Sequence, residues 1–319
     1  MNHRDHPTIE LGPIDVKRFE AGNTGVPYFW AFDSGRPGPR VMVNALTHGN
    51  EMCGAHAVAR LLDAGMRPAR GRLTLGFANV GAYESFDPAY PFISRFLDED
   101  FNRVWDTATL EGPRASRELA RARALRPVID QIDHLLDIHS TELPQAAMLL
   151  AGTRPKNLAL ARAVGFPAHV VLDGGHKAGR RLRDYGQFDE MGSAATSLLV
   201  ECGSHFERGA ADVALRTAML FLRHFGMVDD ATIERLGGVR PGGRQTVVEV
   251  TEAVTIGTDA FRFERILEGF EVVPAAGTVI GHDGPTPVRT PYANCVMVMP
   301  ARNPTKGLTA VRLGRLVDA

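Results

Sequence analysis

The 319-residue sequence has few cysteines, almost no net charge and no long apolar run. Its three cysteines, Cys53, Cys202 and Cys295, are odd in number and far apart, which excludes a disulfide framework. Its 36 basic residues nearly balance its 37 acidic residues, which argues against a nucleic-acid-binding surface. No apolar stretch approaches the roughly 20 residues needed to cross a bilayer, and the polar start offers no signal-peptide core. We therefore expect a cytoplasmic protein with no nucleic-acid or membrane partner.

Short β-branched runs alternate with stretches of helical period over residues 1–235. The expected strands are Arg40–Leu46, Arg72–Asn79, His134–Ile138, Ala146–Ala151, His169–Leu172 and Ser197–Glu201. The expected helices are Met52–Ala64, Arg114–Leu125, Pro155–Val164 and Ala210–Phe225. This alternation predicts an α/β domain with a mixed, mostly parallel sheet that is flanked by helices.

The pattern changes after residue 235. The sequence Arg240-Pro241-Gly242-Gly243 is typical of a linker. Beyond it, the expected strands are short: Thr246–Thr251, Thr255–Ile256, Phe270–Val273, Thr278–Ile280 and Cys295–Met299. Residues 236–319 are therefore predicted to form a small β-rich C-terminal domain.

A histidine and a glutamate follow the first buried strand that we predict. The strand leads into Thr47-His48-Gly49-Asn50-Glu51, after which a helix begins. Open α/β sheets bind ligands at this end of their strands, and an imidazole and a carboxylate three residues apart can converge on one cation. Alternatively, Glu51 favours the positive end of the helix and His48 is a loop histidine. The pair alone leaves both interpretations open.

A second histidine, His139, follows another predicted strand and can approach the first pair across the sheet edge. Asp137 lies two residues earlier, on the same side of the strand, either to orient the histidine or as a structural cap. Two histidines and one glutamate with an open fourth position form the ligand set of a catalytic zinc. We therefore predict one Zn²⁺ per chain, bound by His48, Glu51 and His139.

A third predicted strand ends in Val200-Glu201-Cys202-Gly203. Its position brings Glu201 to the same sheet edge, where a half-buried carboxylate can accept a proton from metal-activated water and return it to a leaving nitrogen. Without the metal ligands, Glu201 would be an ordinary residue at a strand end. Cys202 is predicted to be a small buried packing residue rather than a nucleophile.

An irregular stretch carries Arg95, Asn102 and Arg103. Long irregular stretches within compact domains are typical of functional loops. The forked arginine donors match a carboxylate, and the asparagine adds a neutral donor beside them. A charged surface loop in which arginine pairs with aspartate fits the same composition.

Together these motifs resemble the succinylglutamate desuccinylase/aspartoacylase family, a branch of the zinc carboxypeptidase-like hydrolases. The resemblance covers most of the chain. The segments that carry it are His48-Gly49-Asn50-Glu51, Asp100-Phe101-Asn102-Arg103 (with Phe in place of the family's Leu), Asp137-Ile138-His139-Ser140-Thr141 and Val200-Glu201-Cys202-Gly203. It implies a zinc carboxypeptidase-like fold whose β-rich C-terminal domain caps the active site.

The resemblance also implies a zinc-dependent amidohydrolase that removes the acyl group of an N-acyl amino acid or a related small N-acylated amine. Glu201 would act as general base and acid, Arg95 would help to polarise the scissile carbonyl, and Asn102 and Arg103 would hold a substrate carboxylate. A metallocarboxypeptidase for short peptides is the first alternative, which a capping domain disfavours. A non-catalytic metal- or metabolite-binding protein is the second, and it would not need Glu201. The sequence leaves the oligomeric state open, a homo-oligomer included.

The sequence departs from the family pattern upstream of Glu201. Aspartoacylases carry a further arginine there for the side-chain carboxylate of the substrate, but four residues after Tyr185 the chain has Asp189. Either Arg181 or Arg183 takes that role, or the substrate is not an N-acyl dicarboxylic amino acid. We select Tyr185 and Arg183 as substrate-binding candidates. Because Asp189 would repel a second carboxylate, we expect an amine half that differs from aspartate.

Overall fold

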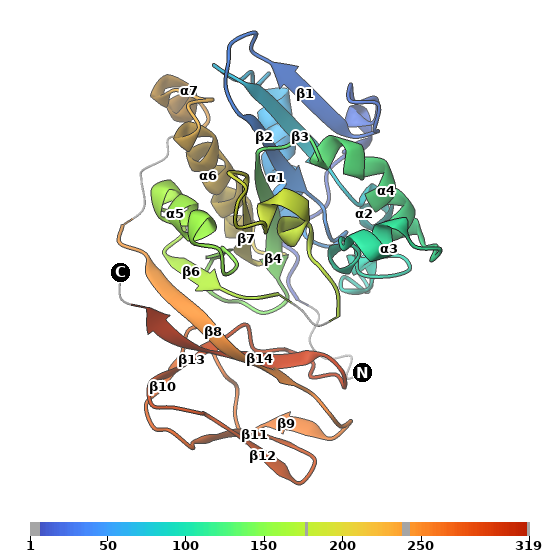
Figure 1. Cartoon of the computed structure of the whole chain (residues 1–319). Coiled ribbons are helices and arrows are strands. Elements are labelled where there is room, and N and C mark those ends of the chain that lie inside the picture. Colours follow the sequence, from blue (N-terminus) through green and yellow to red (C-terminus); the bar gives the residue numbers. More distant parts are fainter. Residues whose placement is uncertain (1–6, 176–177, 238–242, 318–319) are drawn as a thin grey trace.

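The computed structural model describes residues 7–175, 178–237 and 243–317 (Figure 1). The centre of the predicted linker, Arg240-Pro241-Gly242, lies outside the described residues. In the described part of the chain, an eleven-stranded sheet has the order β1-β3-β2-β4-β7-β5-β6-β8-β14-β13-β10, and a three-stranded sheet has the order β12-β11-β9. The predicted fold class is confirmed: a mixed α/β fold with a mostly parallel N-terminal part and a small antiparallel C-terminal sheet.

The strands of the N-terminal part position the residues of the candidate site. They are β1 (Phe29–Asp33), β2 (Arg40–Ala45), β3 (Arg72–Phe77), β4 (His134–Thr141), β5 (Met148–Leu150), β6 (His169–Leu172) and β7 (Thr196–Ser204). Strands β3, β2, β4 and β7 run parallel to one another, whereas β1 and β5 are antiparallel to β3 and β7. Every residue of β7 is buried, as are all residues of β4 except the first, which is why these strands appear as apolar runs in the sequence. Strand β1 was not predicted, because this edge strand is only partly buried.

Helices cover both faces of the sheet. The α-helices are α1 (Met52–Asp63), α2 (Val80–Glu84), α3 (Thr107–Glu111), α4 (Arg117–Ile129), α5 (Pro155–Val164), α6 (Arg208–His224) and α7 (Asp230–Arg235). The short 3₁₀-helices are η1 (Lys17–Phe19), η2 (Ile93–Arg95), η3 (Phe101–Arg103), η4 (Leu182–Asp184) and η5 (Gly186–Phe188). None of the helices in the described segments is both long and apolar enough to span a membrane.

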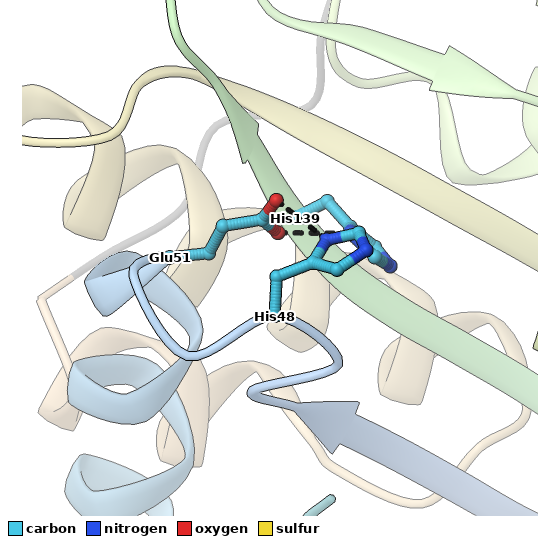
Figure 2. A group of neighbouring side chains, drawn as sticks. All are labelled: His48, Glu51 and His139. Carbon is cyan, nitrogen blue, oxygen red and sulfur yellow. Dashed lines mark hydrogen bonds and ion pairs between the residues drawn. The ribbon is translucent and has the colours of Figure 1, made fainter. Parts of the chain in front are cut away.

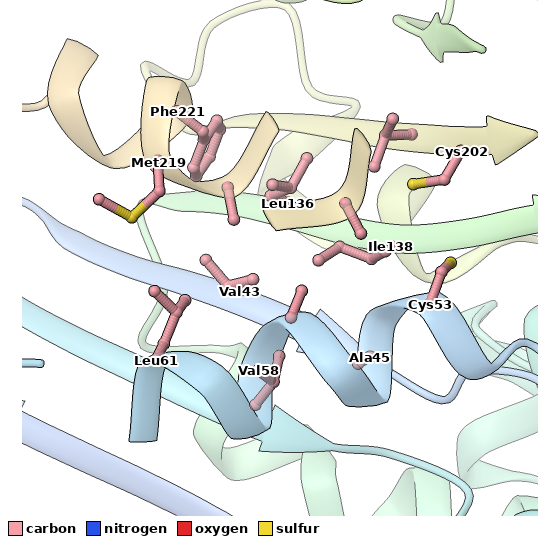
Figure 3. Close-up of a cluster of buried hydrophobic side chains, with 14 of the residues drawn as sticks. Val43, Ala45, Cys53, Val58, Leu61, Leu136, Ile138, Cys202, Met219 and Phe221 are labelled. Atoms are coloured by element: carbon pink, nitrogen blue, oxygen red, sulfur yellow. The ribbon is translucent and has the colours of Figure 1, made fainter. Parts of the chain in front are cut away.

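The main core lies between the sheet and helices α1 and α6 (Figure 3). Val43 and Ile138 from the strands pack against Val58 of α1 and Phe221 of α6. Cys202 is a buried free thiol in this cluster, as predicted. A Cβ on Gly54 would lie 2.9 Å from the Cβ of Ala45, so glycine lets the first turn of α1 lie close to the strands. A second cluster buries the opposite face of the sheet under α4. The helices thus hold the strand ends rigidly.

The C-terminal part continues the large sheet. Its strands are β8 (Thr246–Thr255), β9 (Phe261–Phe263), β10 (Val272–Val273), β11 (Val279–Asp283), β12 (Thr286–Arg289), β13 (Cys295–Val298) and β14 (Thr309–Val317). Strand β8 pairs in parallel with β6 over its first residues and in antiparallel with β14 over most of its length. The two short strands expected within residues 246–256 are therefore one strand. A domain boundary between residues 235 and 236 stays a prediction, because the sheet runs across from β6 to β8.

Candidate active site

The register of three neighbouring strands brings polar side chains to one place. Asn44 of β2 pairs with Asp137 of β4, and His139 of β4 pairs with Glu201 of β7. Register partners, and residues two apart along a strand, point to the same face of a sheet. All four side chains are buried. The strand order therefore assembles this part of the site.

The β2–α1 loop supplies the other two residues. A Cβ on Gly49 would lie 2.3 Å from backbone atoms of Ala82 and Ser94, so only glycine fits between the flanking segments. Glu51 is the N-cap residue of α1, yet its side chain makes no capping hydrogen bond. Its carboxylate turns toward the sheet instead, which decides against a purely helix-capping role.

His48, Glu51 and His139 point toward one another (Figure 2). The Glu51 carboxylate lies 2.7 Å from His48 Nδ1 through Oε1 and 2.8 Å from His139 Nδ1 through Oε2. One ligand atom from each of the three buried residues lies within 4.8 Å of the others. The structure thus brings together the three residues that the sequence predicts as metal ligands.

Carboxylates hold the outer nitrogens of both histidines. Asp137 Oδ2 lies 2.8 Å from His139 Nε2, and Asp100 Oδ1 lies 3.0 Å from His48 Nε2. A carboxylate that accepts from Nε2–H leaves the Nδ1 lone pair for a metal, as is usual for metal-binding histidines. Two imidazoles, one carboxylate and two outer carboxylates therefore fit a zinc ion.

Asp137 is itself held by two donors. Asn44 Nδ2 and Thr47 Oγ1 each donate a hydrogen bond of 2.8 Å to Asp137 Oδ1. Asp137 therefore orients His139, and a role as a structural cap is not needed to explain it. The contributions of Asn44 and Thr47 could not be predicted from the sequence, because they depend on which strands are neighbours.

The charges of the site favour a cation between the ligands. Burial alone would raise the pKa of Glu51, but His48 and His139 outweigh it and hold this pKa well below its usual range. Burial alone would lower the pKa of His139, but Asp137 and Glu51 outweigh it and raise this pKa well above its usual range. In the metal-free protein, a proton on the His139 imidazole therefore supplies positive charge where a metal would supply it.

Glu201 differs from the other carboxyl groups. Burial raises its pKa to about 8, with Glu51 and Asp137 adding to the shift and His139 and Arg95 opposing it. Its side chain is buried, and Oε2 has no hydrogen-bond partner among the described residues. A carboxyl group whose pKa lies close to neutral pH is suited to accept a proton and return it.

Arg95, from η2, lies against the ligands. Its Nη1 donates to Glu51 Oε1 over 3.3 Å, and its Nη2 lies 2.9 Å from His48 Nε2 and 3.3 Å from Asp100 Oδ2. Its side chain is 28% exposed, so the guanidinium can also reach a bound substrate. Asp100, to which we assigned no role from the sequence, bridges Arg95 and His48. Its position at the start of the Asp-x-Asn-Arg motif was the signal that pointed to it.

Asn102 and Arg103 lie next to this group in η3. Asn102 Oδ1 accepts a hydrogen bond of 2.8 Å from the backbone N–H of Leu182. Arg103 Nη2 lies 3.8 Å from Asp100 Oδ2. Burial lowers the pKa of Arg103 to about 10, so the guanidinium remains charged at neutral pH. The structure therefore places both predicted carboxylate-binding residues next to Asp100, which contacts the predicted metal ligand His48.

The other two substrate-binding candidates have partners elsewhere. The Tyr185 hydroxyl donates to Asp130 over 2.7 Å, so it is engaged near α4. Arg183 is fully buried and donates to the carbonyl oxygens of Ala151 and Ser197 over 3.1 and 3.3 Å. Substrate contacts for both residues stay predictions.

Asp189 is paired with an arginine and lines a cavity whose lining includes none of the predicted metal ligands. Arg154 Nε donates to it over 2.9 Å, which balances its charge. The cavity has a volume of about 650 Å³, and its lining includes Trp105 and Arg180 but no predicted metal ligand.

One histidine near the site was missed. His205 follows β7, and its Nδ1 lies 2.8 Å from the hydroxyl of Ser140, the residue after His139. Burial lowers its pKa to about 4, so the imidazole is neutral at pH 7. No motif surrounds it in the sequence, and only the pairing of β4 with β7 brings it here.

Comparisons with known proteins point to one family. The model of the succinylglutamate desuccinylase/aspartoacylase catalytic domain matches residues 37–224. Aspartoacylase from Xenopus tropicalis is 30% identical over 125 residues, a match that spans 36% of this chain and 38% of that protein. Two solved structures share the fold at low identity. Succinylglutamate desuccinylase from Vibrio cholerae has a TM-score of 0.66 at 19% identity, covering 92% of this chain and 86% of that chain. Murine aminoacylase 3 has a TM-score of 0.60 at 20% identity, covering 88% of this chain and 96% of that chain.

The family model covers more than half of the chain and includes His48, Glu51, His139 and Glu201. The predicted resemblance is therefore confirmed, and the chain belongs to the succinylglutamate desuccinylase/aspartoacylase family of amidohydrolases.

Proposed function

We propose that the protein is a zinc-dependent deacylase that hydrolyses the amide bond of an N-acyl amino acid or a related small N-acylated amine. The observation that carries this proposal is the convergence of His48, Glu51 and His139 on the sheet face that also bears Glu201. A protein that only stores a metal has no need for a buried carboxyl group at this position whose Oε2 lacks a hydrogen-bond partner among the described residues. The names of the relatives, an aspartoacylase and an aminoacylase, support the same reaction class.

The ligands would hold zinc through Nδ1 of each histidine and through the Glu51 carboxylate. When bound, zinc supplies a Lewis acid that lowers the pKa of water and polarises a carbonyl group. Glu201 accepts the proton of the attacking water and delivers it to the leaving nitrogen. Arg95 stabilises the negative charge that develops on the carbonyl oxygen.

Arg103 and Asn102 bind a carboxylate of the substrate. The Arg103 guanidinium offers a charged fork, and the Asn102 amide lies beside it in η3. This assignment gives the substrate an acid group next to the scissile amide, as in an N-acyl amino acid.

A release assay tests the proposed function. The zinc-loaded protein is incubated with N-acetyl, N-formyl and N-succinyl derivatives of acidic, neutral and basic amino acids, and the free amine is measured. We expect release from at least one series, loss of release after chelation and recovery with zinc. Failure to cleave any member at one equivalent of zinc would contradict the proposal. Preference for N-acetyl-aspartate would contradict the expectation drawn from Asp189.

Replacing Arg103 with Ala should raise KM for the preferred substrate by about 10- to 100-fold, because a charge-assisted pair contributes about 1.5–3 kcal/mol. The change in kcat should be small, since the carboxylate is bound equally in the ground state and the transition state. Arg114→Ala, which removes an exposed arginine paired with Glu99, is the matched control.

An amide analogue that lacks the carboxylate sharpens this test. The unmodified enzyme should bind it poorly, whereas Arg103→Ala should bind the acid and the amide about equally. Equal KM values of the unmodified enzyme for acid and amide would show that Arg103 does not bind the carboxylate.

A further inference from the structure

Five side chains form a buried row of alternating charges that begins on the last strand. Arg312 of β14 lies 3.0 Å from Asp173 Oδ2, through its Nε. Arg181 Nη1 lies 3.4 Å from the same oxygen, and Arg181 Nε donates to Asp184 Oδ2 over 2.5 Å. Asp184 Oδ1 accepts from Arg183 Nη1 over 2.6 Å. The row thus connects the C-terminal part of the chain with the segment around η4.

Four of the five side chains are buried, and the fifth, Asp184, has a side chain that is 15% exposed. Arg181 and Arg312 are 2% and 4% exposed, and the neighbours of Arg312 in β14, Val311 and Leu313, are core residues. Three cations against two anions leave one net positive charge. A buried ion pair is often no more stabilising than apolar residues of the same volume, so stability does not explain an arginine in this strand. The charge of Arg312 is better explained by an effect on the charged groups around it.

The segment that carries Arg181 is attached to the carboxylate-binding residues. The N–H of Leu182 donates to Asn102 Oδ1 over 2.8 Å, and the N–H of Trp105 donates to the Arg180 carbonyl over 3.1 Å. A Cβ on Gly179 would lie 2.1 Å from the Arg103 carbonyl oxygen, so the two segments are in direct contact. Arg181 therefore occupies the wall beside Asn102 and Arg103.

The charges of the row also reach the catalytic strand. Glu201 acts on the pKa of Arg181 and of Arg312 in the direction that favours their charged forms. Burial lowers the pKa of Arg103 to about 10, Asp100 opposes this shift, and the arginines at 95, 181 and 312 add to it. Arg312 and Arg181 are thus close enough to influence both the general base and the carboxylate-binding arginine.

We propose that Arg312 is a positioning residue for the substrate site, which fixes the carboxylate of Asp173 and thereby holds Arg181 beside Asn102 and Arg103. The inference rests on the proposed function, because it concerns the site of that reaction. It makes strand β14 a part of the substrate site rather than only of a cap. The effect of Arg312 passes through Asp173, so substrate affinity depends on a residue near the C-terminus of the chain.

Binding to an inactive protein tests the proposal without catalysis. Zinc-loaded Glu201→Gln protein is titrated calorimetrically with N-acetyl-aspartate, N-acetyl-leucine, N-acetyl-lysine and N-succinyl-glutamate, alone and with a second substitution. Adding Arg312→Gln should raise Kd by about 10-fold or more, since Asp173 and Arg181 lose their fixed arrangement. Arg312→Lys should recover most of the affinity, because the ammonium restores the charge against Asp173. Arg315→Gln, an exposed arginine on the same strand, should leave Kd unchanged.

A structural role alone predicts a different outcome. In that case Arg312→Gln and the apolar Arg312→Met would change the melting temperature and leave Kd unchanged, which would overturn the proposal. We expect instead that Arg312→Met raises Kd as strongly as Arg312→Gln while the protein stays folded. Asp173→Asn should reproduce the loss of affinity. It replaces the Arg312 variants in this test if neither of them folds. If the Glu201→Gln parent binds none of these acidic, neutral and basic probes, the proposed function itself fails, and this inference fails with it.

Discussion

Replacing Glu201 with Gln should lower kcat by about 10²–10⁴-fold, the usual contribution of general acid–base catalysis. The side chain is buried, and its Oε2 lacks a hydrogen-bond partner among the described residues, so the neutral amide breaks no existing bond there. Burial holds the pKa of Glu201 at about 8, which means that the metal-free protein already carries a neutral group at this position near pH 7. Gln therefore preserves the shape and the charge of that state and removes only the capacity to exchange a proton.

Zinc content and the melting temperature of the metal-free protein should be close to those of the unmodified protein. The matched control is Glu207→Gln, an exposed glutamate six residues later, which should keep full activity. Rates are measured at saturating substrate, and zinc is measured by elemental analysis of the same samples. Loss of zinc from Glu201→Gln would show that Glu201 is a ligand rather than a base.

Replacing His139 with Ala should abolish stable zinc binding and, with it, hydrolysis. Four-ligand zinc sites bind with about 10–16 kcal/mol, which averages about 2.5–4 kcal/mol for each ligand. Removing one ligand therefore weakens binding by about 10²–10³-fold. His139 Nδ1 lies 2.8 Å from Glu51 Oε2, so its loss also removes a positive partner of a buried carboxylate. Zinc is measured after passage of the protein over a chelating column.

Two further variants on β4 calibrate this result. Asp137→Asn keeps His139 but removes the carboxylate that holds its Nε2, and it should weaken zinc binding by about 10- to 100-fold. His134→Ala, at the other end of the same strand, removes a histidine that contacts Thr196 and Phe225 and should retain about one zinc. Retention of one tightly bound zinc by a folded His139→Ala protein would refute the ligand assignment.

The two histidines and two glutamates of the centre were predictable because local sequence and local structure coincide at this place. Strands β2, β4 and β7 are buried on both faces, so each gives an apolar run that ends near a polar residue. In a parallel sheet these ends lie at one edge, and three separate short motifs therefore predict a single site. The pairing of His48 with Glu51 could be predicted from a single loop between a strand and a helix, without knowledge of the strand order.

The roles of the arginines were not predictable in the same way. Arg181 and Arg183 are two residues apart and equally charged, yet they have different partners. Arg181 contacts Asp173, whereas Arg183 donates to the carbonyl oxygen of Ser197 in β7. Tyr185 likewise appears suited to a substrate in the sequence but contacts Asp130. A side chain of this length has several partners within reach, and the chain path around η4 selects among them.

The sequence by itself determined the fold class and pointed to the residues that we propose as metal ligands and general base, because each depends on apolar runs and short spacings along the chain. Only the tertiary structure decided that Asp100 holds His48, that β8 extends the sheet of β6, and that Arg312 reaches Asp173. These contacts join segments tens to more than a hundred residues apart. The strand order and register that create them are set by the packing of the whole sheet, and no local pattern encodes such a pairing.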